Sequence, residues 1–305
     1  MRTNLVIRGD EWLSSVPLHL QLFKEMGFKA PKYAHIAPVM KNDNGNKRKL
    51  SKRKDAEAAV SYYTELGIPK EAVKEYLLNI ANSSFENWRR ANKDKDINEF
   101  DLQLNKMSVS GALFDMVKLQ DVSKIVISNF TAEKVYNESL KWANKYDSEL
   151  KEMLEDDKEY SLKVLGIERG NVKPRKDIAK WSDVKNEIYY MYSDKFEKIK
   201  KEYPWQNIND MSKIKEIVSE YINVYDENDD KQEWFNKIKD VAEKCGYARE
   251  VKEYKANPES YSGHVGDVST VIRIALADRT NTPDMYEIMH VLGKQEVINR
   301  LNKVL

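Results

Sequence analysis

The chain has 305 residues, with 51 Lys and Arg against 50 Asp and Glu, so its formal net charge is +1. This balance excludes nucleic-acid binding through overall basicity, and any such contact must come from local patches of charge. No apolar run approaches the roughly 18 residues of a membrane span, no signal-like segment stands at the start, and the single cysteine excludes an internal disulfide framework, so we expect a cytoplasmic protein.

The first forty residues show a β-α-β pattern. Residues 4–8 (NLVIR) and 33–40 (YAHIAPVM) are short apolar runs typical of strands, and residues 15–26 between them have apolar side chains at helical spacing. In open α/β sheets, ligands bind beyond the carboxyl ends of the strands. The pattern therefore predicts a small α/β lobe with a binding site formed by residues 8–12 and by the segment that follows residue 40.

That following segment, residues 41–54 (KNDNGNKRKLSKRK), carries seven basic residues against a single acidic one. Its Asn-Asp-Asn-Gly stretch favours a tight turn. Lys49 and Lys52 are three residues apart, so both ammonium groups can converge on one polyanion, and Ser51 offers a hydroxyl between them. A charge run is usually a solvated face, but the position of this one after a β-α-β unit favours a phosphate-binding loop.

Helices dominate from residue 55 onward. Residues 55–66 (DAEAAVSYYTEL) should end at Gly67, which suits a helix C-terminus, and Pro69 stands at a position permitted in the first turn of the next helix. Residues 98–115 are less regular and contain Gly111 between short strand-like pieces. We therefore expect two helices directly after the basic loop, followed by a mixed region.

Beyond residue 131 the periodicity is helical throughout, without alternating strand patterns. Apolar residues repeat at spacings of three and four along two stretches, and each stripe is more typical of a core face than of a base-stacking platform. Cys245 ends the second stripe, so we interpret it as a small core residue and not as a nucleophile. The stripes are formed by Ile214, Ile217, Val218, Tyr221, Ile222 and Tyr225, and by Trp234, Ile238, Val241 and Cys245.

Several motifs, taken in order, resemble a known family. They are VIRGDEWLSSVP, PKYAHIAPVM and KLSKR near the start, and IRIALADRTNTPDMYEIMHVLGKQEVINRL at residues 272–301. These segments resemble the second half of the catalytic domain and the extreme C-terminus of bacterial-type glutamyl-tRNA synthetases, class I enzymes whose KMSKS loop often takes the form KLSKR. The resemblance implies ATP-dependent attachment of glutamate to tRNA, with ATP, glutamate and a glutamate-accepting tRNA as partners of a monomer.

The resemblance also implies a mainly α architecture with a residual α/β lobe. Residues 1–54 correspond to the remaining part of the nucleotide-binding catalytic domain with the KLSKR loop, residues 55–146 to a stem-contact region, and residues 147–305 to an α-helical anticodon-binding domain. The family's HIGH-type motif, whose histidines bind ATP phosphates, is absent from the sequence. His19 and His35 are interpreted as packed structural histidines, so the chain is expected to be a C-terminal portion that is not competent for activation alone.

Two alternatives remain open at this stage. The chain can be a natural truncated paralogue that acts as a non-catalytic tRNA-binding or regulatory protein. It can also be a helical interaction module with an incidental lysine loop. The sequence does not distinguish an enzyme specific for the glutamate tRNA from one that also charges the glutamine tRNA.

Site residues follow from the resemblance, motif by motif. Arg8 corresponds to the arginine that meets the carboxylate of the glutamate substrate, and a guanidinium can grip a carboxylate through two parallel hydrogen bonds. The resemblance implies that Trp12 lines the adenylate pocket. The alternative is that Trp12 is a hydrophobic residue that caps a helix. Ser51 and Lys52 are assigned to ATP binding, with Lys52 and, at its edge, Lys49 as catalytic cations. Mg²⁺ would accompany ATP, and no protein-bound metal is predicted because no carboxylate cluster identifies ligands for one.

Overall fold

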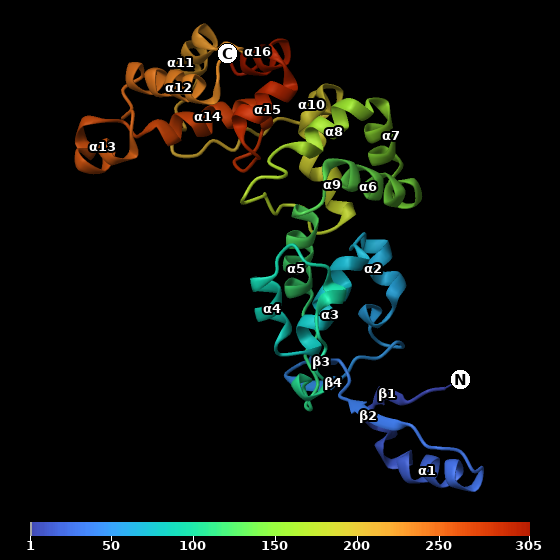
Figure 1. The fold of residues 1–305 in the computed structure, drawn as a ribbon. Helices are drawn as coiled ribbons and strands as arrows, with labels where there is room; N and C mark the ends of the chain where they lie inside the picture. The colour runs from blue at the N-terminus through green and yellow to red at the C-terminus, as the bar shows by residue number, and fades with distance from the viewer. Residues whose placement is uncertain (1) are drawn as a thin grey trace. The chain divides into compact units, whose positions relative to one another are not determined.

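The computed structural model describes residues 2–305, and Figure 1 shows its helices and strands along the chain. The chain divides into two compact units. The first comprises Met1–Ile127 with Ala179–Trp181, and the second comprises Ser128–Ile178 with Ser182–Leu305. Among residues 2–305, every helix is too short or too polar to cross a membrane.

The first unit opens with the expected β-α-β arrangement. Strand β1 (Leu5–Gly9) is followed by a 3-10 helix, η1 (Asp10–Ser15), by helix α1 (Val16–Glu25) and by strand β2 (Lys32–Ile36). The two strands pair in parallel, and their register sets Arg8 opposite His35. The strand predicted over residues 33–40 ends early, at Ile36, because Pro38 has no amide hydrogen with which to continue a ladder.

Helix α1 has the predicted apolar stripe, but the stripe is exposed. None of its residues is buried, and Leu18 is 71% exposed. Parallel strands are usually covered by helices on both faces, and here the described chain pairs only two of them. The lobe therefore carries many exposed apolar side chains, namely Leu5, Ile7, Trp12, Leu13, Leu18, Leu20, Leu22, Met26 and Phe28.

The first part of the segment predicted as a basic loop, residues 40–49, is a β-hairpin, and residues 50–54 form the turn after it. Strands β3 (Met40–Asp43) and β4 (Asn46–Lys49) pair antiparallel. Asn44 and Gly45 between them have φ values of 52° and 87°. An Asn-Gly pair with both φ angles positive matches the twist of a two-residue hairpin. The turn that the composition favoured therefore also brings the two flanking strands, β3 and β4, into pairing.

The remainder of the first unit is helical with an irregular insertion. Gly67 ends helix α2 (Val60–Leu66) with φ 82°, as predicted, and Pro69 lies at the N-cap of helix α3 (Lys70–Ala81), one position earlier than expected. Gly111 approaches the hairpin so closely that a Cβ there would lie 2.6 Å from the Pro38 carbonyl oxygen. The elements are η2 (Ala56–Ala58), α2 (Val60–Leu66), α3 (Lys70–Ala81), α4 (Phe85–Ala91), η3 (Ile97–Glu99), η4 (Leu104–Lys106) and α5 (Met116–Ser128).

The second unit is all-helical, as predicted. An isolated bridge between Ala248 and His264 is the one strand-like pairing among its described residues. Its helices are α6 (Ala132–Tyr146), α7 (Ser148–Asp156), α8 (Lys158–Gly166), α9 (Trp181–Ile188), η5 (Tyr189–Met191), α10 (Ser193–Lys198), α11 (Met211–Val224), α12 (Lys231–Lys244), α13 (Val251–Ala256), η6 (Pro258–Ser260), α14 (Val265–Ala277), α15 (Met285–Leu292) and α16 (Lys294–Asn302).

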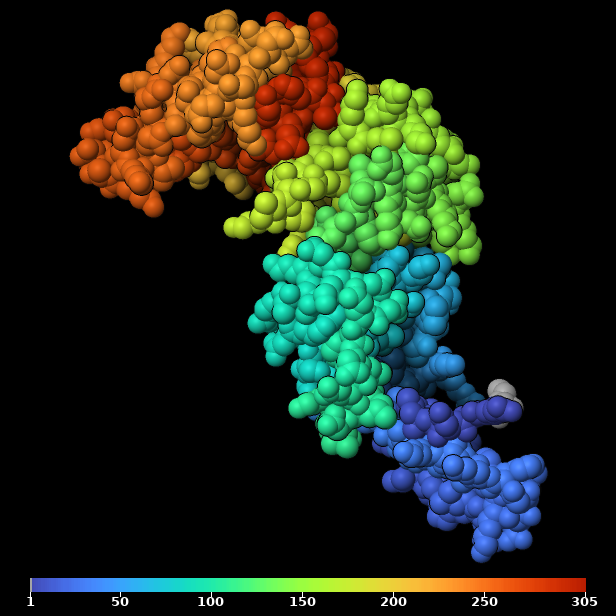
Figure 2. All heavy atoms as spheres, viewed as in Figure 1, coloured from blue at the N-terminus to red at the C-terminus, as the bar shows by residue number. Residues whose placement is uncertain are grey.

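The two aromatic stripes form the core of this unit and not a stacking surface. Tyr221 of α11 is fully buried, its hydroxyl accepts a hydrogen bond from Trp234 Nε1 of α12 at 2.9 Å, and it donates to Met289 Sδ. The atoms of α11 and α16 meet in Figure 2, in orange and red. Cys245 is 3% exposed in the same core, where burial raises the pKa of its thiol to about 11. The interpretation of Cys245 as a core residue is therefore confirmed.

Candidate functional site

Arg8 lies near the end of β1, half-buried among aromatic rings. Its guanidinium lies 4.7 Å from the centroid of the Tyr33 ring and 5.8 Å from that of Trp12. The rings of Trp12, His19, Tyr33 and His35 follow one another in a stacked series, with centroids separated by 6.3, 6.4 and 6.5 Å. The β-α-β fold therefore builds an aromatic cage around a cation from η1, α1 and β2.

Three acceptors hold the guanidinium of Arg8. Nε donates to His35 Nε2 at 3.1 Å, Nη1 donates to His19 Nδ1 at 2.9 Å, and Nη2 donates to the Trp12 carbonyl oxygen at 3.2 Å. A guanidinium has five N–H donors, so one N–H on each terminal nitrogen is left over. Within residues 2–305, no carboxylate pairs with Arg8. The charge of Arg8 is therefore uncompensated. A carboxylate that binds a guanidinium bidentately accepts two hydrogen bonds, which is the number of N–H groups that Arg8 has left.

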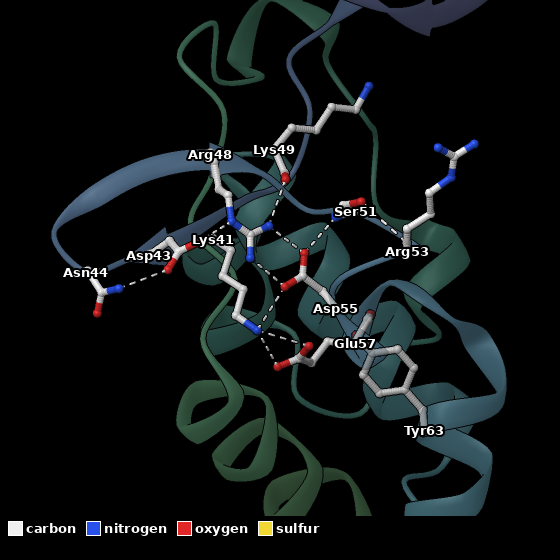
Figure 3. Close-up of polar contacts among 10 residues, drawn as sticks. All are labelled: Lys41, Asp43, Asn44, Arg48, Lys49, Ser51, Arg53, Asp55, Glu57 and Tyr63. Atoms are coloured by element: carbon white, nitrogen blue, oxygen red, sulfur yellow. Dashed lines mark hydrogen bonds and ion pairs between the residues drawn. The ribbon is translucent and has the colours of Figure 1, made fainter.

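A second network fixes the turn after the β-hairpin, and Figure 3 shows its residues. The Arg48 guanidinium donates to both oxygens of Asp55, at 2.7 and 2.8 Å, and the Ser51 amide donates to Asp55 Oδ2 at 2.8 Å. Lys41 lies 3.2 Å from the same carboxylate and 3.0 Å from Glu57. The Asp55 side chain is 1% exposed, and Arg48 holds the pKa of its carboxyl well below the usual range. Two cations of the basic segment are thus structural.

Lys49 and Lys52, which were predicted to be able to converge on one polyanion, differ in whether they already have an acidic partner. Lys49 Nζ pairs with Glu11 Oε1 at 2.8 Å, and Figure 3 shows its side chain directed away from Asp55. This ion pair joins the β-hairpin to the segment that follows Arg8, and it lowers the pKa of the Glu11 carboxyl. Lys52 is exposed, and its ammonium has no partner in the described part of the chain. Lys52 is therefore available to an anion, whereas Lys49 must first leave Glu11.

Of the remaining sequence-predicted residues, Trp12 lies beside Arg8 and is 50% exposed. The Ser51 amide is committed to Asp55, while its hydroxyl accepts from the Arg53 amide at 3.4 Å. No group of three or more metal-binding side chains gathers anywhere in residues 2–305.

Sequence reasoning missed the partners of these residues. His19 and His35, interpreted from the sequence as packed structural histidines, are half-buried and contact Arg8, and no pattern in the sequence pointed to the pairing of Glu11 with Lys49. One signal was present, because parallel pairing of the first and second strands sets positions 8 and 35 side by side. Nothing in the sequence pattern marked Asp55.

Asp55→Asn should loosen the turn at residues 51–55, because the substitution keeps the shape of the side chain and removes the charge that Arg48 and Lys41 share. We expect exchange of the Ser51 amide hydrogen to accelerate by at least about tenfold, and trypsin to cut this segment faster. Asp43→Asn is the matched control, since Asp43 pairs with the same Arg48 at 2.6 Å but is exposed. Equal exchange rates in the two variants would contradict a special role for Asp55.

The pH dependence of the same amide gives a second check. The folded-state pKa of Asp55 is lowered, so its contribution to stability is present above the ordinary carboxyl pKa of about 3.9 and is lost only as pH falls below it. Protection of the Ser51 amide should therefore persist at about pH 4 and decline under stronger acid.

Two family models match the chain. The anticodon binding domain model matches residues 134–305, and the model of the catalytic domain of class I tRNA synthetases for E and Q matches residues 1–121. The chain is 48% identical to a glutamate–tRNA ligase of Clostridium perfringens over 306 residues, and 48% identical to one of Acetivibrio thermocellus over 305 residues. Both alignments cover 100% of this chain and 55% of the relative, so the chain spans about half the length of these curated relatives.

Solved structures share the fold. A glutamate tRNA ligase from Elizabethkingia meningosepticum, crystallised in complex with its amino acid, superposes with a TM-score of 0.63 at 22% identity. A glutamate–tRNA synthetase from Elizabethkingia anophelis superposes with a TM-score of 0.64 at 21% identity. Each match covers 99% of this chain and 56% of the solved one.

Proposed function

This chain belongs to the glutamate–tRNA ligase family of class I synthetases, and we propose that it supplies the KMSKS-type loop, the glutamate carboxylate site and the tRNA-binding part of such an enzyme. The observation that carries the proposal is the Arg8 guanidinium, which has two N–H groups left over and no carboxylate partner among residues 2–305. It stands near a basic turn whose Lys52 is also unpaired. A carboxylate and a phosphate can thus be bound on the same lobe.

We assign Arg8 to the carboxylate of glutamate. A guanidinium binds a carboxylate bidentately through two N–H groups, and Arg8 has two that no residue among 2–305 accepts from. Trp12, half-exposed beside Arg8, offers an aromatic face to the adenylate.

Lys52, Ser51 and Lys49 are assigned to ATP. When the glutamate carboxylate attacks the α-phosphorus, pyrophosphate leaves and negative charge grows on the phosphate oxygens, so a cation held at that point lowers the barrier. Lys49 reaches the phosphates by exchanging Glu11 for them. An exposed ion pair is weakened by solvent and salt, so this exchange opposes binding only weakly. Mg²⁺ is proposed to arrive with ATP.

The tRNA is proposed to bind through residues 55–146, which contact its stem, and through the helical residues 147–305, which read the anticodon. The second assignment is supported by the anticodon binding domain model over residues 134–305. We further propose that the enzyme acts as a monomer in the cytoplasm, where tRNA is charged.

Glutamate-dependent and tRNA-dependent ATP–pyrophosphate exchange tests this function. The 305-residue chain is measured alone and after fusion to the part of the Clostridium perfringens relative that it does not match. We expect exchange from the fusion and none above background from the chain alone, because adenylate formation depends on groups that must be positioned together. Failure of a folded fusion to exchange, or turnover by the chain alone at about 1 per second or faster, would contradict the proposal.

A further inference from the structure

Arg8 determines the proton positions on two histidines. A guanidinium donates hydrogen bonds and has no acceptor, so each ring nitrogen that faces Arg8 must present a lone pair. Those nitrogens are Nε2 of His35 and Nδ1 of His19. We infer that both rings are neutral and of opposite tautomer, His35 protonated on Nδ1 and His19 on Nε2, and that they act as positioning residues of the carboxylate site proposed above.

The contacts suit this role because they come from separate elements. His35 lies on β2 directly opposite Arg8 of β1, His19 lies on α1, and the Trp12 carbonyl belongs to η1. Three acceptors in different directions fix the plane of the guanidinium, and the Tyr33 ring at 4.7 Å supports one of its faces. The direction of the two remaining N–H groups is then set before any ligand arrives.

Neutral imidazoles are the acceptors that leave Arg8 able to bind an anion. A carboxylate in the place of either ring would neutralise the guanidinium and compete with the substrate for it. An imidazolium would present N–H to N–H and add a like charge beside the cation. A neutral ring accepts one hydrogen bond and leaves the charge of Arg8 for the ligand.

The first test is carried out on the 305-residue chain and does not depend on enzymatic activity. Nitrogen-15 spectra of the histidine rings at about pH 8, above the ordinary histidine pKa of about 6.5, report which nitrogen carries the proton. We expect the Nδ1–H tautomer for His35, which is the less common form in free peptides, and the Nε2–H tautomer for His19. A proton on His35 Nε2 or on His19 Nδ1 would overturn the inference.

The second test separates positioning from packing. His35→Phe keeps a stacked ring and removes the acceptor, whereas His35→Gln keeps an acceptor and removes the ring. We expect the Arg8 Nε–H to exchange with solvent at least about tenfold faster in the Phe variant, with partial restoration in the Gln variant. His290→Phe, in the second unit, is the control that should change nothing at Arg8. Unchanged exchange in His35→Phe would overturn the inference.

The third test uses the active fusion. His35→Phe should raise the KM for glutamate at least about tenfold while kcat changes less, and His35→Gln should stay within about threefold of the parent. A glutamate KM unaffected by His35→Phe would overturn the positioning role. A glutamate KM unaffected by Arg8→Ala would instead refute the carboxylate site itself, so that failure of the proposed function is distinguished from failure of this inference.

Discussion

Lys52→Ala should lower the rate of glutamyl-adenylate formation by about 100-fold or more in the active fusion. Lys52 carries no ion pair in the described chain, and removing one preorganised group that meets transition-state charge typically lowers kcat by about 10² to 10³. The loss should appear mainly in kcat, because the charge that Lys52 meets grows as pyrophosphate leaves.

Arg8→Ala should affect a different kinetic parameter from Lys52→Ala. Arg8→Ala should mainly raise the KM for glutamate, because its contact with the carboxylate exists already in the ground state. Lys47→Ala is the matched control for charge, since Lys47 is an exposed lysine of the same hairpin. Pre-steady-state measurement of adenylate formation checks all three variants. A Lys52→Ala rate within about twofold of the parent, less than about 0.5 kcal/mol of barrier, would show that the basic turn does not stabilise the transition state.

The helical half of the fold could be predicted from the sequence because its signal is local. The stripe that contains Ile217 and Tyr221 repeats at three and four, and the one helix face that these positions share is buried. The β-α-β unit could be predicted for a similar reason, since short apolar runs flank an amphipathic segment. The exposure of the apolar stripe of α1 could not be predicted, because burial depends on neighbouring elements and not on periodicity.

The site itself was predicted only in part because its partners are distant or polar. Glu11 and Lys49 are 38 residues apart, and their pairing depends on how the hairpin folds back toward η1. Asp55 binds Arg48 across the turn at residues 51–55, whereas the sequence pattern predicted only a phosphate-binding loop and gave Asp55 no place in it. The resemblance therefore proposed Arg8 and Lys52, and tertiary geometry shows which of these cations already hold an acidic partner and which have none among residues 2–305.

The 305-residue chain should bind glutamate tRNA by itself, with an affinity that falls steeply with salt. Contacts to the phosphate backbone dominate such affinities, and each neutralised phosphate contributes a log–log slope of about −0.7 to −0.9. About six contacts would reduce the affinity by roughly 10³-fold between 50 and 200 mM salt. Because the net charge of the whole chain is only +1, this dependence must come from local patches.

A preference for the correct anticodon should survive at every salt concentration, because base contacts release few counterions and bases are read by stacking and hydrogen bonding. Fluorescence titrations with glutamate tRNA and an anticodon-swapped version therefore should give two parallel salt plots. Lys52→Ala should reduce the log–log slope of both plots by at most the contribution of one phosphate. The difference in affinity between the two tRNAs should stay unchanged. A truncation is a poor control, since Ala179–Trp181 belong to the first unit and would be lost with the second. Superimposed plots for the two tRNAs would remove the anticodon-reading role of residues 147–305 and favour a generic helical module instead.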